Sequence, residues 1–232
     1  MTTAEFAVEL DARIAKFDLL CHPFYKAWSE GQLTREDLRE YALDYYEHVR
    51  AFPTYLAELA LRLDESHTRR AVLANMGEEM GHEKGRPSGP SHAELWMDFA
   101  VGMGAGKEFA RPVLSEIKEL VQHFNGVASE GTVEEALAAF YAYESQVPRI
   151  ATEKERGLRA WYGADDKTCS YFTLHQTADL YHSQVWRKLL EKQVAENPEA
   201  AEKALAAGEA AAAKLWGALD GMESRRQSAV AA

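Results

Sequence analysis

The sequence has little cysteine, and its arrangement excludes a disulfide framework. Among the 232 residues there are two cysteines, Cys21 and Cys169, which are far apart and form no CxxC spacing. Networks of disulfides stabilise many small secreted proteins, whereas isolated thiols are typical of reducing compartments. We therefore interpret both side chains as reduced thiols and predict a cytoplasmic protein.

Long hydrophobic runs are also missing. No stretch approaches the roughly eighteen consecutive apolar residues that a membrane-spanning helix requires. The first residues, MTTAEFAVELDARIAKF, lack the basic segment and apolar run of a secretory signal. We expect neither a membrane span nor a cleaved leader.

Positive charge is scarce relative to negative charge. The chain has 26 lysine and arginine residues against 37 acidic residues, which gives a net charge of −11. Proteins that bind nucleic acids need clustered basic side chains to contact phosphates, so this balance argues against such a partner. Hydrophobic residues still make up 47% of the chain, which is sufficient for a core at this length.

Strand patterns are nearly absent, while helical periodicity runs through most of the chain. We predict helices over residues 33–63 with a kink or break at Pro53, 66–81, 92–104, 111–124, 132–161 interrupted at Pro148, 165–195 and 198–222. The segment HEKGRPSGPS, residues 82–91, is rich enough in glycine and proline to be a loop. Because no long linker or internal repeat divides the chain, we predict one all-α domain over residues 1–223. It would be a bundle of about seven to eight helices, followed by a polar tail at 224–232.

One stretch of the chain carries side chains that metal ions bind. In TLHQTADLYHSQVW, residues 173–186, His175, Asp179 and His182 follow one another at spacings of four and three. On a single helix these positions fall on one face, within roughly 60° of arc. The row is either a set of metal ligands or an ordinary mixture of polar residues on a solvated surface, and its spacing alone leaves both interpretations open.

Further candidate ligands lie in other predicted helices. Glu144 is surrounded by aromatic residues in AAFYAYESQVPRI, where a solvated acid would be unusual. The ring of Pro148 opposes the carbonyl of Glu144, so we expect the helix to be distorted at this carboxylate. Glu79 lies in NMGEEMG and His92 begins HAELW, although nothing in its own surroundings distinguishes Glu79 from the neighbouring acids.

Together these residues suggest a site for two metal ions. Metal sites in helical bundles take ligands from several helices, and a buried charge requires a partner. A mixture of imidazoles and carboxylates suits iron or manganese better than a structural zinc site. Three carboxylates would leave two divalent ions with a small positive charge and with positions open for dioxygen. The candidate ligands are Glu79, His92, Glu144, His175, Asp179 and His182.

Three blocks of the sequence resemble one known family. HPFYKAWSEGQLTREDLREYALDYYEHVRAFPTYL, ESQVPRIATEKERGL and the row from His175 to His182 are similar to the CADD family, the Chlamydia protein associating with death domains and its bacterial relatives. The resemblance covers nearly the whole chain, and the TenA and PqqC groups are more distantly similar. It implies a heme-oxygenase-like bundle and a dimetal oxidase that makes p-aminobenzoate for folate synthesis. It also implies that the protein is its own substrate, because a tyrosine side chain is cut out to supply the ring.

The matching blocks assign roles to residues of this chain. The six candidate ligands named above would hold the metals. Tyr25 would be the sacrificed tyrosine, Lys154 would donate the amino group and Tyr41 would be an auxiliary tyrosine near the site. Without the resemblance, Tyr25 would be read as a core tyrosine and Lys154 as a solvated helical lysine. An Fe/Fe or Mn/Fe pair, dioxygen and an external reductant would be required. The electron donor is unidentified, and we expect a homodimer.

One feature departs from the family pattern. The segment HEKGRPSGPS lengthens the separation of Glu79 and His92 to thirteen positions. It also supplies His82, which completes an acid-x-x-His spacing with Glu79 of the kind that di-iron bundles use. We predict that His92 is the ligand, with His82 as the alternative.

Two other functions remain open. One is a dimetal oxidase that turns over repeatedly on an external small molecule. The other is a metal-free protein of the TenA or PqqC type, either an enzyme or a binding module. A TenA-like hydrolase would need a nucleophilic cysteine, for which Cys169 is the nearer candidate to the ligand row.

Overall fold

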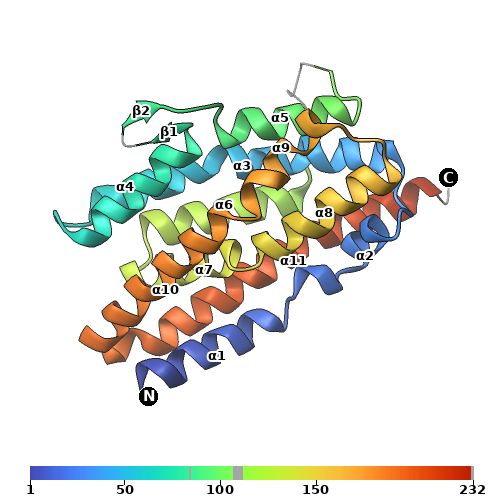
Figure 1. The fold of residues 1–232 in the computed structure, drawn as a ribbon. Coiled ribbons are helices and arrows are strands. Elements are labelled where there is room, and N and C mark those ends of the chain that lie inside the picture. Colours follow the sequence, from blue (N-terminus) through green and yellow to red (C-terminus); the bar gives the residue numbers. More distant parts are fainter. Residues whose placement is uncertain (84, 107–111, 231–232) are drawn as a thin grey trace.

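The computed structural model describes residues 1–83, 85–106 and 112–230, and within these ranges the chain is almost entirely helical (Figure 1). Its elements are α1 Thr3–Ala15, η1 Leu19–Cys21, α2 Pro23–Ser29, α3 Arg35–Arg62, α4 His67–Glu79, β1 His82–Glu83, β2 Arg86–Pro87, α5 His92–Gly102, α6 Ser115–Ser129, α7 Val133–Glu144, α8 Val147–Trp161, α9 Asp166–His175, α10 Ala178–Glu196, η2 Pro198–Ala200 and α11 Ala201–Val230. The prediction of an all-α bundle is confirmed. Among the described residues, no helix combines the length and the apolar character needed to cross a bilayer.

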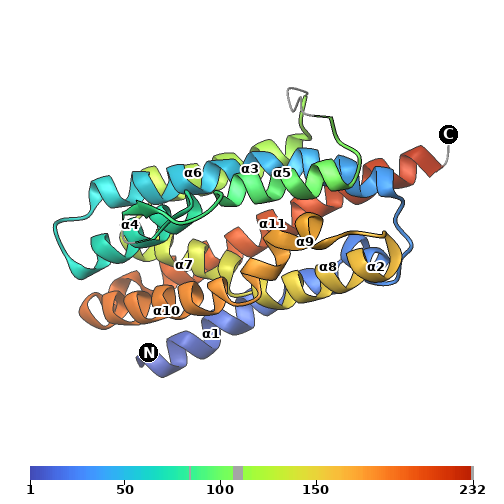
Figure 2. The ribbon, with the colours of Figure 1, turned by 45° about the horizontal axis from the view of Figure 1, so that its top comes forward.

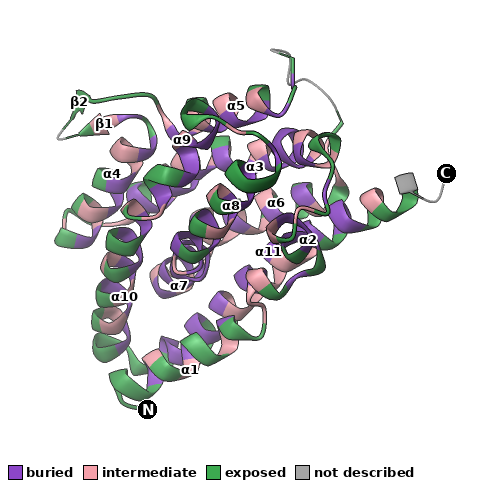
Figure 3. Cartoon of the chain, turned by 45° about the vertical axis from the view of Figure 1, so that its right-hand side comes forward, coloured by how far each residue is buried: buried purple, intermediate pink, exposed green. Residues whose placement is uncertain are grey.

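Helix α7 forms the centre of the bundle. It packs against α6, α10 and α11, and every residue from Ala136 to Glu144 is buried (Figure 3). Alanines on α7 and on the facing side of α11 let these two helices approach closely, and leucines such as Leu205 and Leu215 fill the space around them. A helix that is apolar on all sides belongs in a core. Glu144, at the end of this helix, is therefore carried into the interior.

The outer helices form two groups on opposite sides of α7. Helices α3, α5 and α6 run side by side along one side of α7, and α1, α8 and α10 lie on the other, as Figures 1 and 2 both show. Helix α4 joins the first group through α3, and α9 joins the two groups because it contacts both α5 and α8. The helix ends that will matter below, those of α4, α5, α7, α9 and α10, are thereby brought together.

The described residues contain more helices than the predicted seven or eight, because two predicted helices are each divided in two and because α1 and α2 lie where no helix was predicted. The helix predicted over 132–161 ends at Glu144 and resumes at Val147, which confirms the interruption expected near Pro148. The helix predicted over 165–195 ends at His175 and resumes at Ala178. By contrast, α3 runs through Pro53 without a break, so a break there was wrong.

Other predicted boundaries also differ from the structure. Helix α11 continues to Val230, so the polar tail predicted at 224–232 is helical over its described part. Arg225 explains this extension, because its guanidinium pairs with the buried Asp44 of α3. The predicted helix over 111–124 begins at a residue outside the described ranges, and the observed α6 runs five residues beyond Phe124, to Ser129.

The segment between α4 and α5 forms a small hairpin. Strands β1 and β2 pair antiparallel, with His82 opposite Pro87, and the chain enters the hairpin through Gly81 at a φ of 76°. Such a positive φ favours glycine, because a Cβ would be strained there. The chain then returns to start α5, where Ser91 and Glu94 form a capping box. The hairpin projects outward, so the ends of α4 and α5 remain neighbours.

Helix α2 lies against α8 because Gly157 leaves room for Trp28. A Cβ at position 157 would lie 2.8 Å from Cδ1 and 3.1 Å from the carbonyl oxygen of Trp28. The indole of Trp28 also donates a hydrogen bond of 3.3 Å to the carbonyl of Lys154. These contacts fix the position of α2, which carries Tyr25, relative to Lys154.

Replacing Gly157 by alanine should therefore destabilise the protein. Alanine improves helix propensity by about 1 kcal/mol, but forcing a methyl group into a filled space costs about 1–3 kcal/mol. Gly217→Ala in α11 is the matched control, since no atom lies within 4 Å of its added Cβ. We expect urea unfolding to show a lower free energy of unfolding for Gly157→Ala and a higher one for Gly217→Ala. Equal stabilisation of both variants would contradict the proposed contact.

Candidate metal centre and its tyrosine–lysine neighbour

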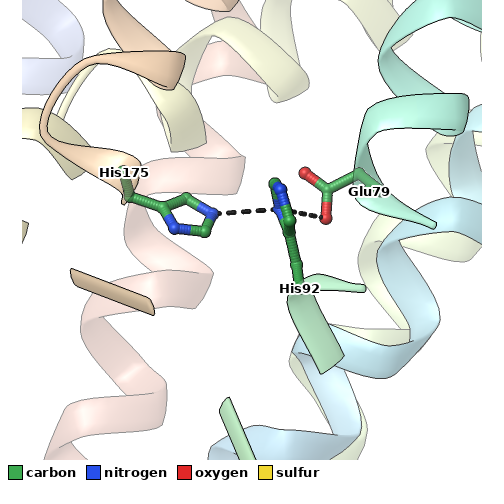
Figure 4. A group of neighbouring side chains, drawn as sticks. All are labelled: Glu79, His92 and His175. Atoms are coloured by element: carbon green, nitrogen blue, oxygen red, sulfur yellow. Dashed lines mark hydrogen bonds and ion pairs between the residues drawn. The ribbon is translucent and has the colours of Figure 1, made fainter. Parts of the chain in front are cut away.

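Three buried side chains from three helix ends form a first triad, shown in Figure 4. Glu79 ends α4, His92 begins α5 and His175 ends α9. Nδ1 of His92 lies 2.8 Å from Oε2 of Glu79 and 3.1 Å from Nε2 of His175. Three atoms that can each donate a lone pair thus face a common point.

The orientation of His175 is fixed from behind. Its Nδ1 lies 2.6 Å from the carbonyl oxygen of Tyr171, which can only accept a hydrogen bond, so Nδ1 carries the proton. The ring of Tyr171 also stacks on the imidazole, with 3.9 Å between ring centres. In the neutral imidazole, the lone pair therefore sits on Nε2, the atom that faces His92. A carbonyl behind a histidine is the usual support of a metal ligand.

A second triad lies beside α7 and α10. It consists of Glu144, Asp179 and His182, whose candidate ligand atoms all lie within 4.8 Å of one another. Nδ1 of His182 is 3.2 Å from Oδ1 of Asp179. The carboxylate of Glu144 accepts hydrogen bonds from the indole of Trp186 and, at 3.3 Å, from the side-chain amide of Asn75. These two donors orient Glu144 toward the other members of the triad.

The electrostatics of both triads show carboxylates and imidazoles that balance one another. Burial raises the pKa of Glu144 well above its usual range. Burial lowers the pKa of His182, but hydrogen bonds to Asp179 and Glu78 outweigh it and raise that pKa to about 11. In the first triad, burial disfavours both charged forms, yet the pairing of His92 with Glu79 raises the pKa of the imidazole and lowers that of the acid. Such sites attract cations, because removing carboxylates from water without a positive partner is costly.

The sequence suggested that His175, Asp179 and His182 lie on one face of a single helix, and this was wrong. The chain leaves the helix at Gln176 and Thr177, between α9 and α10. Because of this break, His175 belongs to the first triad, and Asp179 and His182 belong to the second. The three side chains are buried, so the interpretation as a solvated surface is also wrong.

The structure places His92, and not His82, beside the other candidate ligands. His82 lies half-buried in β1, and neither triad of the described residues includes it. The hairpin takes up the additional residues between α4 and α5, and this is why thirteen positions still separate two neighbours in space. All six predicted ligands are buried and divide into two groups of three.

The three other predicted site residues form a separate cluster. The hydroxyls of Tyr25 and Tyr41 are 3.0 Å apart, and Nζ of Lys154 donates hydrogen bonds to both, at 2.7 Å to Tyr25. All three side chains are buried, so the interpretation of Lys154 as a solvated lysine is wrong. Nζ lies between 4.2 and 6.0 Å from the centres of six aromatic rings, those of Tyr25, Trp28, Tyr41, Tyr45, Trp96 and Phe172.

Burial determines the charge of this lysine. It lowers the pKa of Lys154 well below its usual value, and it raises the pKa of Tyr25 and of Tyr41. Aromatic faces attract a cation only modestly, whereas full desolvation of an ammonium group is expensive. Burial therefore favours a neutral amine against two neutral phenols.

Tyrosines that the sequence analysis did not select connect this cluster with the triads. A small cavity of about 30 Å³ is lined by Lys154 and Tyr25 of this cluster and also by Tyr143 and Tyr171. Tyr171 in turn stacks on His175. Only their positions in the sequence could have indicated these tyrosines, since Tyr143 precedes Glu144 and Tyr171 lies one helical turn before His175. Neither spacing is distinctive on its own.

Comparison with known proteins agrees with this architecture. The family described as "Iron-containing redox enzyme" matches residues 39–217. The chain is 38% identical over 195 residues to a 4-aminobenzoate synthase from Chlamydia pneumoniae, covering 82% of this chain and 84% of that protein. It is 38% identical over 234 residues to a 4-aminobenzoate synthase from Nitrosomonas europaea, covering 96% and 92%.

A solved structure supports the same fold at lower sequence identity. A domain of unknown function with a heme oxygenase-like fold from Shewanella denitrificans superposes with a TM-score of 0.80, at 14% identity, and the match covers 98% of this chain and 94% of that one. This similarity establishes the fold, and the sequence matches establish the family. The chain is an oxidoreductase of the iron-containing redox enzyme family with a heme oxygenase-like fold, and it belongs to the family of the 4-aminobenzoate synthases.

Proposed function

We propose that this protein produces 4-aminobenzoate by an oxygen-dependent reaction in which Tyr25 supplies the ring and Lys154 supplies the nitrogen. The relatives named 4-aminobenzoate synthase support the product. The observation that carries the assignment of residues is the 2.7 Å contact between Nζ of Lys154 and the hydroxyl of Tyr25, inside a buried cluster that adjoins six buried candidate metal ligands.

The donor atoms fit a pair of iron or manganese ions. Each triad offers imidazole nitrogen and carboxylate oxygen, a combination suited to these metals. Burial raises the pKa of Glu144, and a bound cation would counteract that rise. We propose Glu79, His92 and His175 for one ion and Glu144, Asp179 and His182 for the other. When bound, the pair would supply the redox chemistry needed to use dioxygen, with electrons from an external reductant.

The chain's own residues meet the chemical requirements of the product. The ring and Cβ of a tyrosine contain all the carbon atoms of 4-aminobenzoate, so excision must break the bond between Cβ and Cα. Cβ must also be oxidised to a carboxylate, with dioxygen as the oxidant. The amino group must replace the phenolic oxygen, beside which Nζ of Lys154 lies, so a bond from Nζ to the ring must form while the ring's bond to oxygen and the Nζ–Cε bond of the lysine break. A protonated amine has no lone pair to form a bond to carbon. The lowered pKa of Lys154 therefore supports its role as nitrogen donor.

The alternatives fit the described site less well. An external aromatic molecule has no room beside Lys154, where the cavity holds about 30 Å³, whereas a cavity of roughly 150 Å³ accommodates benzene. The pocket of about 540 Å³ that reaches His92 could admit another small molecule, but it is not lined by Lys154 or Tyr25. A TenA-like hydrolase needs a reactive thiolate. Burial instead raises the pKa of Cys169 to about 11, and Cys21 is exposed.

Metal loading should distinguish His92 from His82. We expect the wild-type chain, reconstituted with Mn(II) or Fe(II) without oxygen, to bind two ions. His92→Ala should retain about one, because the first triad loses a donor, while His82→Ala should retain both. Elemental analysis of gel-filtered protein measures the ratio. Loss of an ion from His82→Ala, or two firmly bound ions in His92→Ala, would contradict the assignment.

Self-modification should leave a trace at Tyr25. After incubation of the metal-loaded chain with a reductant and oxygen, we expect peptide mass spectrometry to find a mass loss in the peptide containing Tyr25, with about one product molecule per modified chain. Tyr25→Phe should abolish the product. Tyr46→Phe, which alters a half-buried tyrosine of α3 outside the cluster, should leave it unchanged. Abundant 4-aminobenzoate from intact protein would refute self-sacrifice.

The neutral state of Lys154 predicts a dependence of stability on pH. Because burial lowers the pKa of this amine in the folded chain below its unfolded value of about 10.4, unfolding takes up a proton at pH values between the two, and raising the pH there stabilises the fold. Between about pH 7 and pH 9, the free energy of unfolding should rise less steeply for Lys154→Met than for the wild type. Lys188→Met, at an exposed position of α10, should keep the wild-type slope. Parallel slopes for all three proteins would show that Lys154 is charged in the fold.

A further inference from the structure

We propose that Glu78 is a positioning residue, which keeps a hydrogen on Nε2 of His182 so that Nδ1, the nitrogen beside Asp179, is free to bind an ion. This inference rests on the proposed dimetal site and adds to it a residue outside both triads. Oε2 of Glu78 lies 2.7 Å from Nε2 of His182, across the interface between α4 and α10. On the other side of the ring, Nδ1 lies 3.2 Å from Oδ1 of Asp179.

The chemistry of imidazole makes the contact decisive. A neutral histidine has one N–H group and one lone pair, on opposite nitrogens. A carboxylate can only accept, and His182 has one beside each nitrogen, so without an ion the ring carries a proton on both. If an ion replaced the proton on Nδ1, Glu78 would hold the remaining hydrogen on Nε2 and leave the Nδ1 lone pair to the ion. In His175 the roles of the two nitrogens are reversed, because the carbonyl of Tyr171 accepts the hydrogen bond from Nδ1 and the lone pair lies on Nε2. Each triad would then contain a histidine whose tautomer is fixed by an oxygen behind it.

The two consecutive acids at the end of α4 thus have different roles. Glu79 turns inward to His92, whereas Glu78 reaches sideways to His182 and remains 41% exposed. The contact of Glu78 is on the nitrogen that faces away from Asp179, so its carboxylate is placed to orient the ring and not to share an ion with Asp179 on Nδ1. The sequence NMGEEMG gave no means of separating these two side chains.

Glu78 also occupies the boundary between the site and solvent. It lines a groove of about 60 Å³ between α4 and α10 that reaches His182, and a larger pocket of about 540 Å³ under the hairpin that reaches His92. A partly exposed carboxylate keeps much of its hydration. Glu78 can therefore accept a hydrogen bond from the buried ring without the desolvation cost of burying a second charge. It can thus orient His182 without adding a buried charge to either triad.

The test compares Glu78→Ala with Glu78→Gln, because the glutamine oxygen can still accept the Nε2 proton. Zinc(II) alone serves as a diamagnetic probe, and protein labelled with ¹⁵N in histidine reports the state of each ring nitrogen by long-range ¹H–¹⁵N NMR. In the wild type and in Glu78→Gln, we expect His182 to show a metal-bound Nδ1 and a protonated Nε2. In Glu78→Ala this signature should be lost or mixed, and one of the two ions should bind about 10–100-fold more weakly.

The controls separate this inference from the proposed function. Glu83→Ala, at an exposed position of the hairpin, should leave both ions and the His182 signals unchanged. Glu78→Ser provides a second truncation if Glu78→Ala does not fold. Wild-type affinity and wild-type His182 signals in the truncated variants would overturn the positioning role alone. A Glu78→Gln variant as defective as the truncations would also overturn it, by making Glu78 a ligand. Failure of the wild type to bind two ions would instead overturn the dimetal site and the function proposed from it.

Discussion

The structure depends on the burial of three carboxylates in the core of a helical bundle. Glu79, Asp179 and Glu144 are 6% exposed or less, and removing such groups from water is among the most expensive steps that folding can include. The cost is offset only where positive or hydrogen-bonding partners lie within reach. Imidazoles, an indole and an amide meet this need here, and a pair of cations would meet it more fully. The convergence of five helix ends on one region follows from that requirement.

A second buried site beside the first is built on the opposite principle. Around Lys154 the neighbours are aromatic rings and phenols, whose modest attraction for a cation does not compensate for the loss of water, so burial favours the neutral amine. The two environments adjoin through Tyr171, whose ring stacks on His175 and also lines the cavity next to Lys154. One region of the fold thus concentrates charge while its neighbour excludes it. This contrast would let a redox-active centre lie close to an unprotonated nitrogen and an oxidisable ring.

Much of the fold and of the site could be predicted from the sequence, because the patterns that indicate them involve residues close together in the chain. Glu144 stood out as an acid within an apolar helix, and the break beside it follows from the ring of Pro148. The division between α9 and α10 was missed because the segment from Thr173 to His182 contains neither proline nor glycine. The continuity of α3 through Pro53 was missed for the converse reason, since packing on both sides of a long helix can compensate for one lost hydrogen bond. The contact of Glu78 with His182 depends on how α4 and α10 pack, which no local pattern encodes.

The proposed reaction has a consequence for the fold that produces it. Tyr25 is 4% exposed and packs against Trp28 and Tyr41, so excision of its ring would leave a cavity in the core. Truncation of a buried aromatic side chain typically costs about 3–5 kcal/mol, a large part of the stability of a domain. Helix α2 is nevertheless held by contacts that do not involve the ring, including the cap formed by His22, which also pairs with Asp220 of α11. A protein that consumes its own tyrosine would therefore keep its architecture while losing stability, and single use would be built into the chemistry by the loss of the ring itself.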